Sequence, residues 1–241
     1  MKSYIKLINV SLQFQLFNNK PSLRKYFFDF FTKNKLSNIN SKALNKINLE
    51  INEGDRVGVI GSNGSGKSTL LRVLSGIYPV TEGSINLSGS CNSLIDIFSG
   101  IDYNASGYEN ILLRGMLIGH SKKEIVDLAP SIIKISGLED YIYSPVRTYS
   151  SGMLMRLAFF VTLSKPCQIV IMDEWLSVGD ENFKKISNKF LLEYLSKSNI
   201  FIIATHSKEL LEQMTDKVIW LEKGDLVKFD KTEVIVREYF N

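Results

Sequence analysis

A glycine-rich segment at residues 57–71 constrains the fold more than any other part of the chain. An apolar run leads into a loop made of Gly61, Ser62, Asn63, Gly64, Ser65, Gly66, Lys67, Ser68 and Thr69. The glycines allow backbone conformations closed to other residues, so that successive N–H groups can face one anion. A helix that begins near Lys67 adds unpaired N–H groups and the positive end of its dipole. The segment therefore predicts a strand, a phosphate-binding loop and a helix.

The side chains of this loop indicate which ligand it binds. Lys67 can reach the β- and γ-phosphates of a nucleotide, and the Ser68 hydroxyl can be a ligand of Mg²⁺. A glycine-rich turn without a ligand is the alternative. The strand before the loop and the helix after it favour the nucleotide.

Composition limits the other classes of protein. A chain of 241 residues fits one large domain, with or without a subdomain. The 29 basic and 25 acidic residues are mixed along the chain, which argues against nucleic acid as a partner. Cys91 and Cys167 suit a reducing compartment. Because no apolar stretch is long enough to cross a bilayer, we expect a soluble chain whose membrane role comes through a partner.

The N-terminal part predicts two half-buried strands with a helix between them. Apolar and polar residues alternate in both strands, which is typical of antiparallel pairing. The apolar positions are Ile8, Val10, Leu12 and Phe14 in the first strand, and Ile47, Leu49 and Ile51 in the second. Between them, helical spacing of aromatic residues predicts an amphipathic helix over residues 21–33.

The rest of the chain predicts a parallel sheet interrupted by helices. Residues 169–172 and 200–204 are continuous apolar runs, as expected for strands buried on both faces. Residues 93–165 are mostly helical in pattern and form an inserted subdomain. Residues 218–227 have the pattern of a closing hairpin.

Polar residues follow both buried runs, where ligands of α/β sheets bind. Asp173 is the candidate for Mg²⁺, through water, and Glu174 the candidate for polarising an attacking water. His206 follows the second run and is placed to contact the γ-phosphate or the water. A structural or surface role is the alternative for His206. A further turn at Tyr149–Met153 opens a helix and is a second possible anion site, although such turns are common.

The order of these motifs resembles the nucleotide-binding subunit of an ATP-binding cassette (ABC) transporter. Residues 149–153 stand where that family has Leu-Ser-Gly-Gly-Gln. This chain has the variant Tyr-Ser-Ser-Gly-Met there. That variant, together with residues 106–110 and 173–180, resembles the branch that exports bacterial surface polysaccharides. The resemblance implies an α/β P-loop NTPase fold over residues 1–241, with a RecA-like core, an antiparallel β subdomain and the inserted helical subdomain.

The family also implies a function and partners. The expected protein hydrolyses ATP with Mg²⁺ to export a lipid-linked O-antigen, capsule or teichoic acid through a separate integral membrane permease. It works as two ATPase and two permease subunits at the cytoplasmic face of the bacterial inner membrane. The alternatives are a transporter ATPase for another substrate and a soluble ABC ATPase outside transport.

The resemblance further implies a composite site in a homodimer. Each ATP lies between one P-loop and the partner's signature segment, which consists of Ser150, Ser151, Gly152 and Met153. Asp180 falls in the loop that crosses the dimer. Phe14 matches the aromatic residue that stacks on adenine, with a core phenylalanine as the alternative.

One expected residue departs from the family pattern. The glutamine expected between the P-loop and the helical subdomain is missing, and Asp96 or Asp102 is the candidate replacement at the metal. The 21–33 helix matches a helix on the membrane side of this branch, with a core-facing or an interfacial membrane helix as alternatives. Because the chain ends at Asn241, just past the closing hairpin, we expect no carbohydrate-binding domain.

Overall fold

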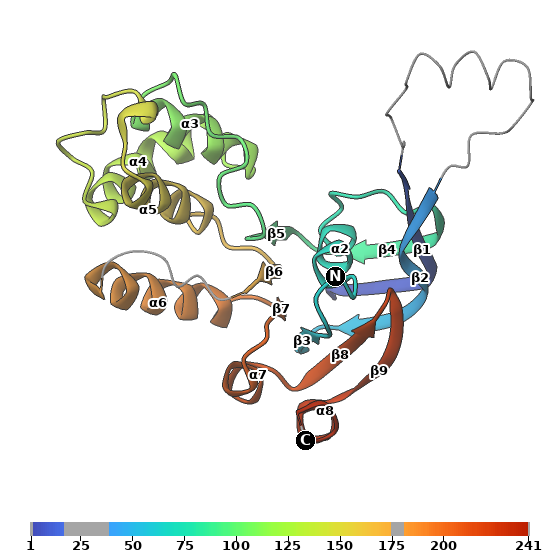
Figure 1. Cartoon of the computed structure of the whole chain (residues 1–241). Helices are drawn as coiled ribbons and strands as arrows, with labels where there is room; N and C mark the ends of the chain where they lie inside the picture. The colour runs from blue at the N-terminus through green and yellow to red at the C-terminus, as the bar shows by residue number, and fades with distance from the viewer. Residues whose placement is uncertain (1, 17–38, 175–180, 241) are drawn as a thin grey trace, which may run out of the picture.

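A computed structural model describes residues 2–16, 39–174 and 181–240 (Figure 1). The helix predicted over residues 21–33 and the position of Asp180 lie outside these ranges. The described chain forms two sheets and a group of helices. Figure 1 shows helices α3 to α6 gathered at one end and the smaller sheet at the other.

The smaller sheet is antiparallel and has the strand order β2-β1-β4. Its strands are β1 (Tyr4–Leu16), β2 (Ile39–Asn52) and β4 (Glu82–Ser88). The larger sheet has the order β5-β6-β7-β3-β8-β9, in which only the pairing of β8 with β9 is antiparallel. Its strands are β3 (Arg56–Ile60), β5 (Cys91–Ser93), β6 (Ile169–Asp173), β7 (Ile200–Ala204), β8 (Lys217–Glu222) and β9 (Asp225–Lys231).

The helices cover the larger sheet or extend beyond it. They are α2 (Lys67–Leu74), α3 (Gly107–Leu117), α4 (Lys122–Ser136), the 3-10 turn η1 (Val146–Thr148), α5 (Ser151–Thr162), α6 (Glu181–Ser196), α7 (Lys208–Met214) and α8 (Thr232–Tyr239). Between β5 and β6 the described chain is helical apart from its connections, as the inserted block predicts.

The predicted central strands β6 and β7 are confirmed, and they are buried on both faces. Ile171 and Ile202 face a core shared with α2 and the antiparallel sheet. Their neighbours Met172 and Ile203 face the other core, which contains residues of α5 and α6. Because side chains alternate along a strand, a strand covered on both sides must be apolar throughout.

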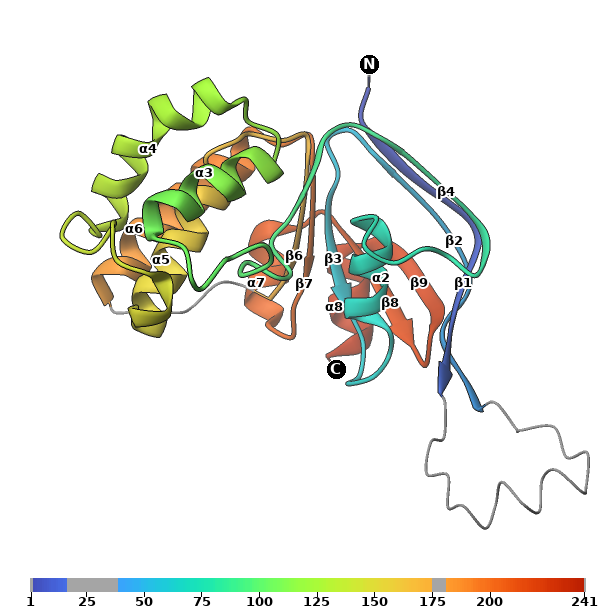
Figure 2. The ribbon, with the colours of Figure 1, turned by 90° about the horizontal axis from the view of Figure 1, so that it is seen from above.

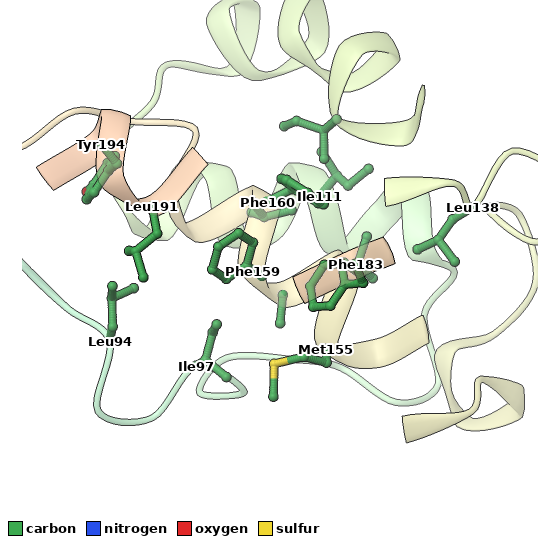
Figure 3. Packing of buried hydrophobic residues seen from close by; sticks show 14 of the residues in the cluster. Leu94, Ile97, Ile111, Leu138, Met155, Phe159, Phe160, Phe183, Leu191 and Tyr194 are labelled. Carbon is green, nitrogen blue, oxygen red and sulfur yellow. The ribbon is translucent and has the colours of Figure 1, made fainter. Parts of the chain in front are cut away.

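The core under the helices is rich in aromatic residues (Figure 3). Phe159 and Phe160 of α5 both pack edge-on against Phe183 of α6, with ring centroids 5.8 and 6.1 Å apart. Edge-to-face contacts of this kind add to the stabilisation from buried area. They fix α5 against α6 next to the strand that carries Asp173.

The alternation predicted for β1 is interrupted at one point. Val10 and Leu12 are buried as expected, but Ile8 is 41% exposed. Asn9 has a φ of 49°, and the pairing register shifts between Leu7 and Val10. Across this bulge the alternation shifts by one residue, so the side chains before and after it do not follow one continuous pattern. The prediction of a buried Ile8 is therefore wrong.

Gly83 lies against this bulge and provides a stability test. Its φ is +82°, and an added Cβ would lie 2.3 and 2.4 Å from the carbonyl oxygens of Asn9 and Ile8. Gly76 also has a positive φ, of +71°, but an added Cβ there would meet nothing within 4 Å. We expect Gly76→Ala to cost about 1 kcal/mol of unfolding free energy through backbone strain alone. Gly83→Ala should cost roughly 1–3 kcal/mol more through overpacking. Urea denaturation measures both variants, and equal losses would contradict the contact.

Candidate functional site

A cleft of about 540 Å³ lies where strands β3, β6 and β7 end. It brings together residues from five separate segments of the chain. They are Ser41, Lys42, Ala43, Asn63, Gly64, Gly66, Lys67, Ser68, Thr69, Arg72, Ile95, Asp173, Glu174, Ala204, Thr205 and His206. Most of the predicted loop therefore lines the same cleft as the predicted acidic pair and histidine.

The loop after β3 has the geometry of an anion cradle. Gly66, at φ +106°, precedes the first residue of α2, and a Cβ there would lie 2.7 Å from the Ala43 carbonyl oxygen. The helix starts at Lys67 as predicted, and its N-cap residue is Gly66, which has no side chain that could accept a hydrogen bond from the first turn. Its free N–H groups therefore remain available to an anion.

Lys67 is held over the loop by the loop itself. Its Nζ donates to the carbonyl oxygens of Gly61 at 2.9 Å and Ser62 at 3.1 Å. Partial burial lowers the pKa of Lys67, while the nearby carboxylates of Asp173 and Glu174 act in the opposite direction. The ammonium group is thus positioned between the loop and the acidic wall.

The turn between β8 and β9 supports the loop from outside, which the sequence did not indicate. Ser62 Oγ donates to the Glu222 carboxylate at 2.6 Å. The Gly224 N–H donates to the Ser65 carbonyl oxygen at 2.9 Å. The two bonds tie the start and the middle of the loop to the hairpin.

The acidic wall comes from the end of β6. Asp173 is its last residue and is half-buried, whereas Glu174 is exposed in the cleft. Glu174 has a φ of 66°, which is unusual for a residue other than glycine. Its N–H donates to the Ala204 carbonyl oxygen at 2.8 Å. This bond fixes Glu174 to the end of β7, two residues before the exposed His206.

The signature segment lies outside the cleft of its own chain. Ser150 caps α5, and its Oγ accepts a hydrogen bond from the Met153 N–H at 3.2 Å. Ser151 and Gly152 occupy the first turn of α5, and neither lines the cleft. The N-terminus of α5 therefore does not line the cleft that contains the phosphate loop of the same chain.

Two predicted residues stand beside the cleft without lining it. Ile95 forms part of the wall, while the next side chain, Asp96, is exposed to solvent. Binding of a metal ion by Asp96 stays a prediction. Phe14 is 38% exposed and packs edge-on against Tyr78, with ring centroids 5.6 Å apart. Stacking of Phe14 on adenine stays a prediction.

The donor atoms of the cleft fit Mg²⁺. The Ser68 hydroxyl and the Asp173 carboxylate are hard oxygen donors on its walls. Mg²⁺ is commonly bound by one or two protein ligands together with substrate phosphates and water. Among the described residues, no group of three or more His, Cys, Asp and Glu side chains is placed to hold a metal ion without other ligands.

Fold and cleft together define a P-loop nucleotide-binding protein. The sequence model of the ABC transporter family matches residues 44–177, more than half of the chain. The chain belongs to the ABC transporter family.

The similar proteins include export ATPases. The teichoic acids export ATP-binding protein TagH of Shouchella clausii is 38% identical over 238 residues, which are 98% of this chain and 65% of the relative. The O-antigen export system ATP-binding protein RfbE of Yersinia enterocolitica is 36% identical over 222 residues, 90% of this chain and 93% of the relative. The chain thus spans just under two thirds of the length of the TagH relative.

Solved structures share the fold at low sequence identity. An ATP-binding subunit of an ABC transporter superimposes with a TM-score of 0.70 at 18% identity, covering 98% of this chain and 93% of that one. The dimeric ATP-binding cassette MJ0796 bound to ADP and Pi gives 0.68 at 20% identity, with 95% and 98% covered. These structures confirm the predicted ABC-type fold.

In the described part of the chain, no helix has the length and apolar character that a bilayer crossing requires.

Proposed function

We propose that this protein is the ATP-hydrolysing subunit of an exporter for a lipid-linked surface polysaccharide. The observation that carries the proposal is the cleft, where Lys67 and Ser68 meet Asp173, Glu174 and His206. A phosphate-binding loop facing two carboxylates is suited to cleaving the terminal phosphoanhydride bond of ATP.

Each side chain has a defined part in this reaction. The loop N–H groups and Lys67 bind the β- and γ-phosphates, and Ser68 and Asp173 hold Mg²⁺, which neutralises phosphate charge when bound. Glu174 orients and deprotonates the attacking water. His206 contacts the γ-phosphate or that water from the neighbouring strand end.

The complete site needs a second copy of the chain. Ser150, Ser151, Gly152 and Met153 of one subunit would close over the γ-phosphate held by the other, with Asp180 in the loop that crosses the dimer. The position of the signature segment outside its own cleft supports this arrangement. The solved cassette MJ0796 is dimeric.

The substrate class follows from the relatives. Both relatives described above are named for polysaccharide export, one for teichoic acids and one for O-antigen. We infer a pair of these subunits bound to a pair of membrane permease subunits on the cytoplasmic face of a bacterial membrane. The glycan itself then crosses the membrane through the permease.

A cell experiment tests the export function. The chromosomal copy is replaced by one encoding Lys67→Ala, and surface glycan is compared with the lipid-linked glycan inside the cell. Loss of surface glycan with internal accumulation is expected. Unchanged surface glycan, with the variant as the only copy, would rule out the export function.

His206→Ala tests the histidine. Because the imidazole acts on the γ-phosphate or the water, its removal should lower the rate of ATP hydrolysis and leave ADP affinity close to the parent value. His120→Ala is the matched control, since His120 Nε2 bonds Ser164 Oγ in the helical region. Phosphate release and ADP titration measure both variants. Equal rates for parent and His206→Ala would show that the histidine is structural.

A further inference from the structure

Arg72 places a cation in the cleft that the proposed reaction does not use. It lies on α2 and lines the cleft together with Ser68 and Thr69. Among the residues that the structure describes, no carboxylate lies within ion-pair distance of its guanidinium group, and that group donates no hydrogen bond. Arginine remains charged at neutral pH and carries five N–H donors, so these donors are free for a ligand.

One aromatic ring lies next to this guanidinium group, and a second ring packs against the first. Arg72 Cζ lies 5.8 Å from the centre of the Tyr78 ring, and the Tyr78 N–H donates to the Arg72 carbonyl oxygen at 3.2 Å. Phe14 packs edge-on against the same Tyr78 ring at an interplanar angle of 79°. A cation over an aromatic face is attracted to it and loses less freedom on binding a ligand. The Phe14–Tyr78 pair thus supports the arginine.

Helix geometry shows which part of a nucleotide Arg72 can reach. Residues three and four apart share one helix face, so Arg72 lies one turn beyond Thr69 and Ser68 on the same face. At 1.5 Å per residue, its backbone is about 4.5–6 Å farther along the helix axis than theirs. Arg72 therefore enters the cleft from the second turn of α2, beyond the residues that hold the phosphates.

The walls of the cleft give the direction of the nucleotide. Glu174 and His206 come from the β6–β7 side, whereas Ser41, which pairs with Phe14 across β1 and β2, comes from the opposite side. Figure 2 shows α2 between these two sides. If the γ-phosphate points to Glu174 and His206, the nucleoside lies toward Ser41 and Arg72.

We propose that Arg72 is a nucleotide-recognition residue that binds the nucleoside part of ATP. Its donors match the acceptors there, which are the ribose oxygens and the ring nitrogens of the base. The inference rests on the proposed binding of ATP in this cleft. It assigns to Arg72 affinity for ATP and ADP alike and no part in cleaving the γ-phosphate.

The test uses Arg72→Gln in the full chain and three probes: ATP, ADP and inorganic tripolyphosphate. Because a charge-assisted bond to the nucleotide is lost, affinity for ATP and ADP should fall by the same factor, about tenfold. Affinity for tripolyphosphate, measured by competition, should stay unchanged. In steady-state hydrolysis the KM should rise while kcat is retained.

Matched variants separate this role from a structural one. Arg237→Gln removes the same group from the exposed side of α8 and should alter none of these values. Tyr78→Leu should also lower the affinity for ATP and for ADP, but by a smaller factor than Arg72→Gln. Arg72→Lys keeps the charge but lacks the planar guanidinium group with its paired N–H donors. Its affinities for ATP and ADP should therefore lie between those of the parent and Arg72→Gln. Melting temperatures check that each variant is folded.

The outcomes distinguish the inference from the function on which it rests. A parent protein that binds no ATP would overturn the proposed function. Normal binding by the parent with unchanged ATP and ADP affinity in Arg72→Gln would overturn the inference alone. An equal loss of tripolyphosphate affinity, or a lower kcat, would show that Arg72 serves the phosphates or the chemistry instead.

Discussion

Glu174→Gln is expected to slow ATP hydrolysis by about a hundredfold or more while ATP still binds. Glutamine keeps the shape of the side chain but cannot take the proton of the attacking water. The backbone should hold its position, because the Glu174 N–H bonds the Ala204 carbonyl oxygen independently of the side chain. With hydrolysis blocked, the variant should accumulate as an ATP-bound dimer.

Phosphate release and size-exclusion chromatography with ATP measure these two effects. Glu233→Gln is the control for the change of charge, because Glu233 is exposed on α8 away from the cleft. Turnover equal to the parent would show that Glu174 is not the base. Loss of ATP binding would show that the residue acts on affinity.

Lys67→Ala is expected to remove most of the ATP affinity and leave the fold intact. A charged hydrogen bond contributes about 1.5–3 kcal/mol, so the loss of the contacts to two phosphates should weaken binding by at least about tenfold. In the free protein Lys67 Nζ bonds two loop carbonyl oxygens at the cleft surface, which water can replace. The melting temperature without nucleotide should therefore stay close to that of the parent.

Titration of ATP against the folded variant measures this loss. Lys123→Ala, on the exposed side of α4, removes the same charge at a distance and should bind ATP normally. Near-parent affinity in Lys67→Ala would refute the assignment of the loop. A collapse of the fold would show that the lysine stabilises the loop in the absence of a ligand.

Features encoded over a few neighbouring residues could be predicted from the sequence. The helix start at Lys67 and the buried strands β6 and β7 follow from local patterns, and the structure confirms them. The position of β6 beside β7 also follows, because the carboxyl ends of parallel strands meet at one edge of a sheet. Asp173 and His206 could thus be placed in one site before any coordinates were known.

Other features depended on contacts that no local pattern records. The bulge at Asn9 turns Ile8 to solvent, although the alternation on both sides of it is regular. A single inserted residue changes which side chains point to each face of the strand, while the composition of the strand stays nearly the same. Asp96 is a metal candidate by its position in the sequence, and that assignment stays a prediction; the neighbouring residue that lines the cleft is Ile95.

The sequence by itself determined the phosphate loop, the acidic pair and the family, because each is a short run whose chemistry depends on its own spacing. Only the tertiary structure decided that the hairpin holds Ser62 through Glu222, and that Phe14 packs on Tyr78 while Arg72 lines the cleft. Ser62 and Glu222 are separated by 160 positions in the chain. Pairs this far apart meet only when the sheet is assembled, so their contacts leave no periodic signal in the sequence.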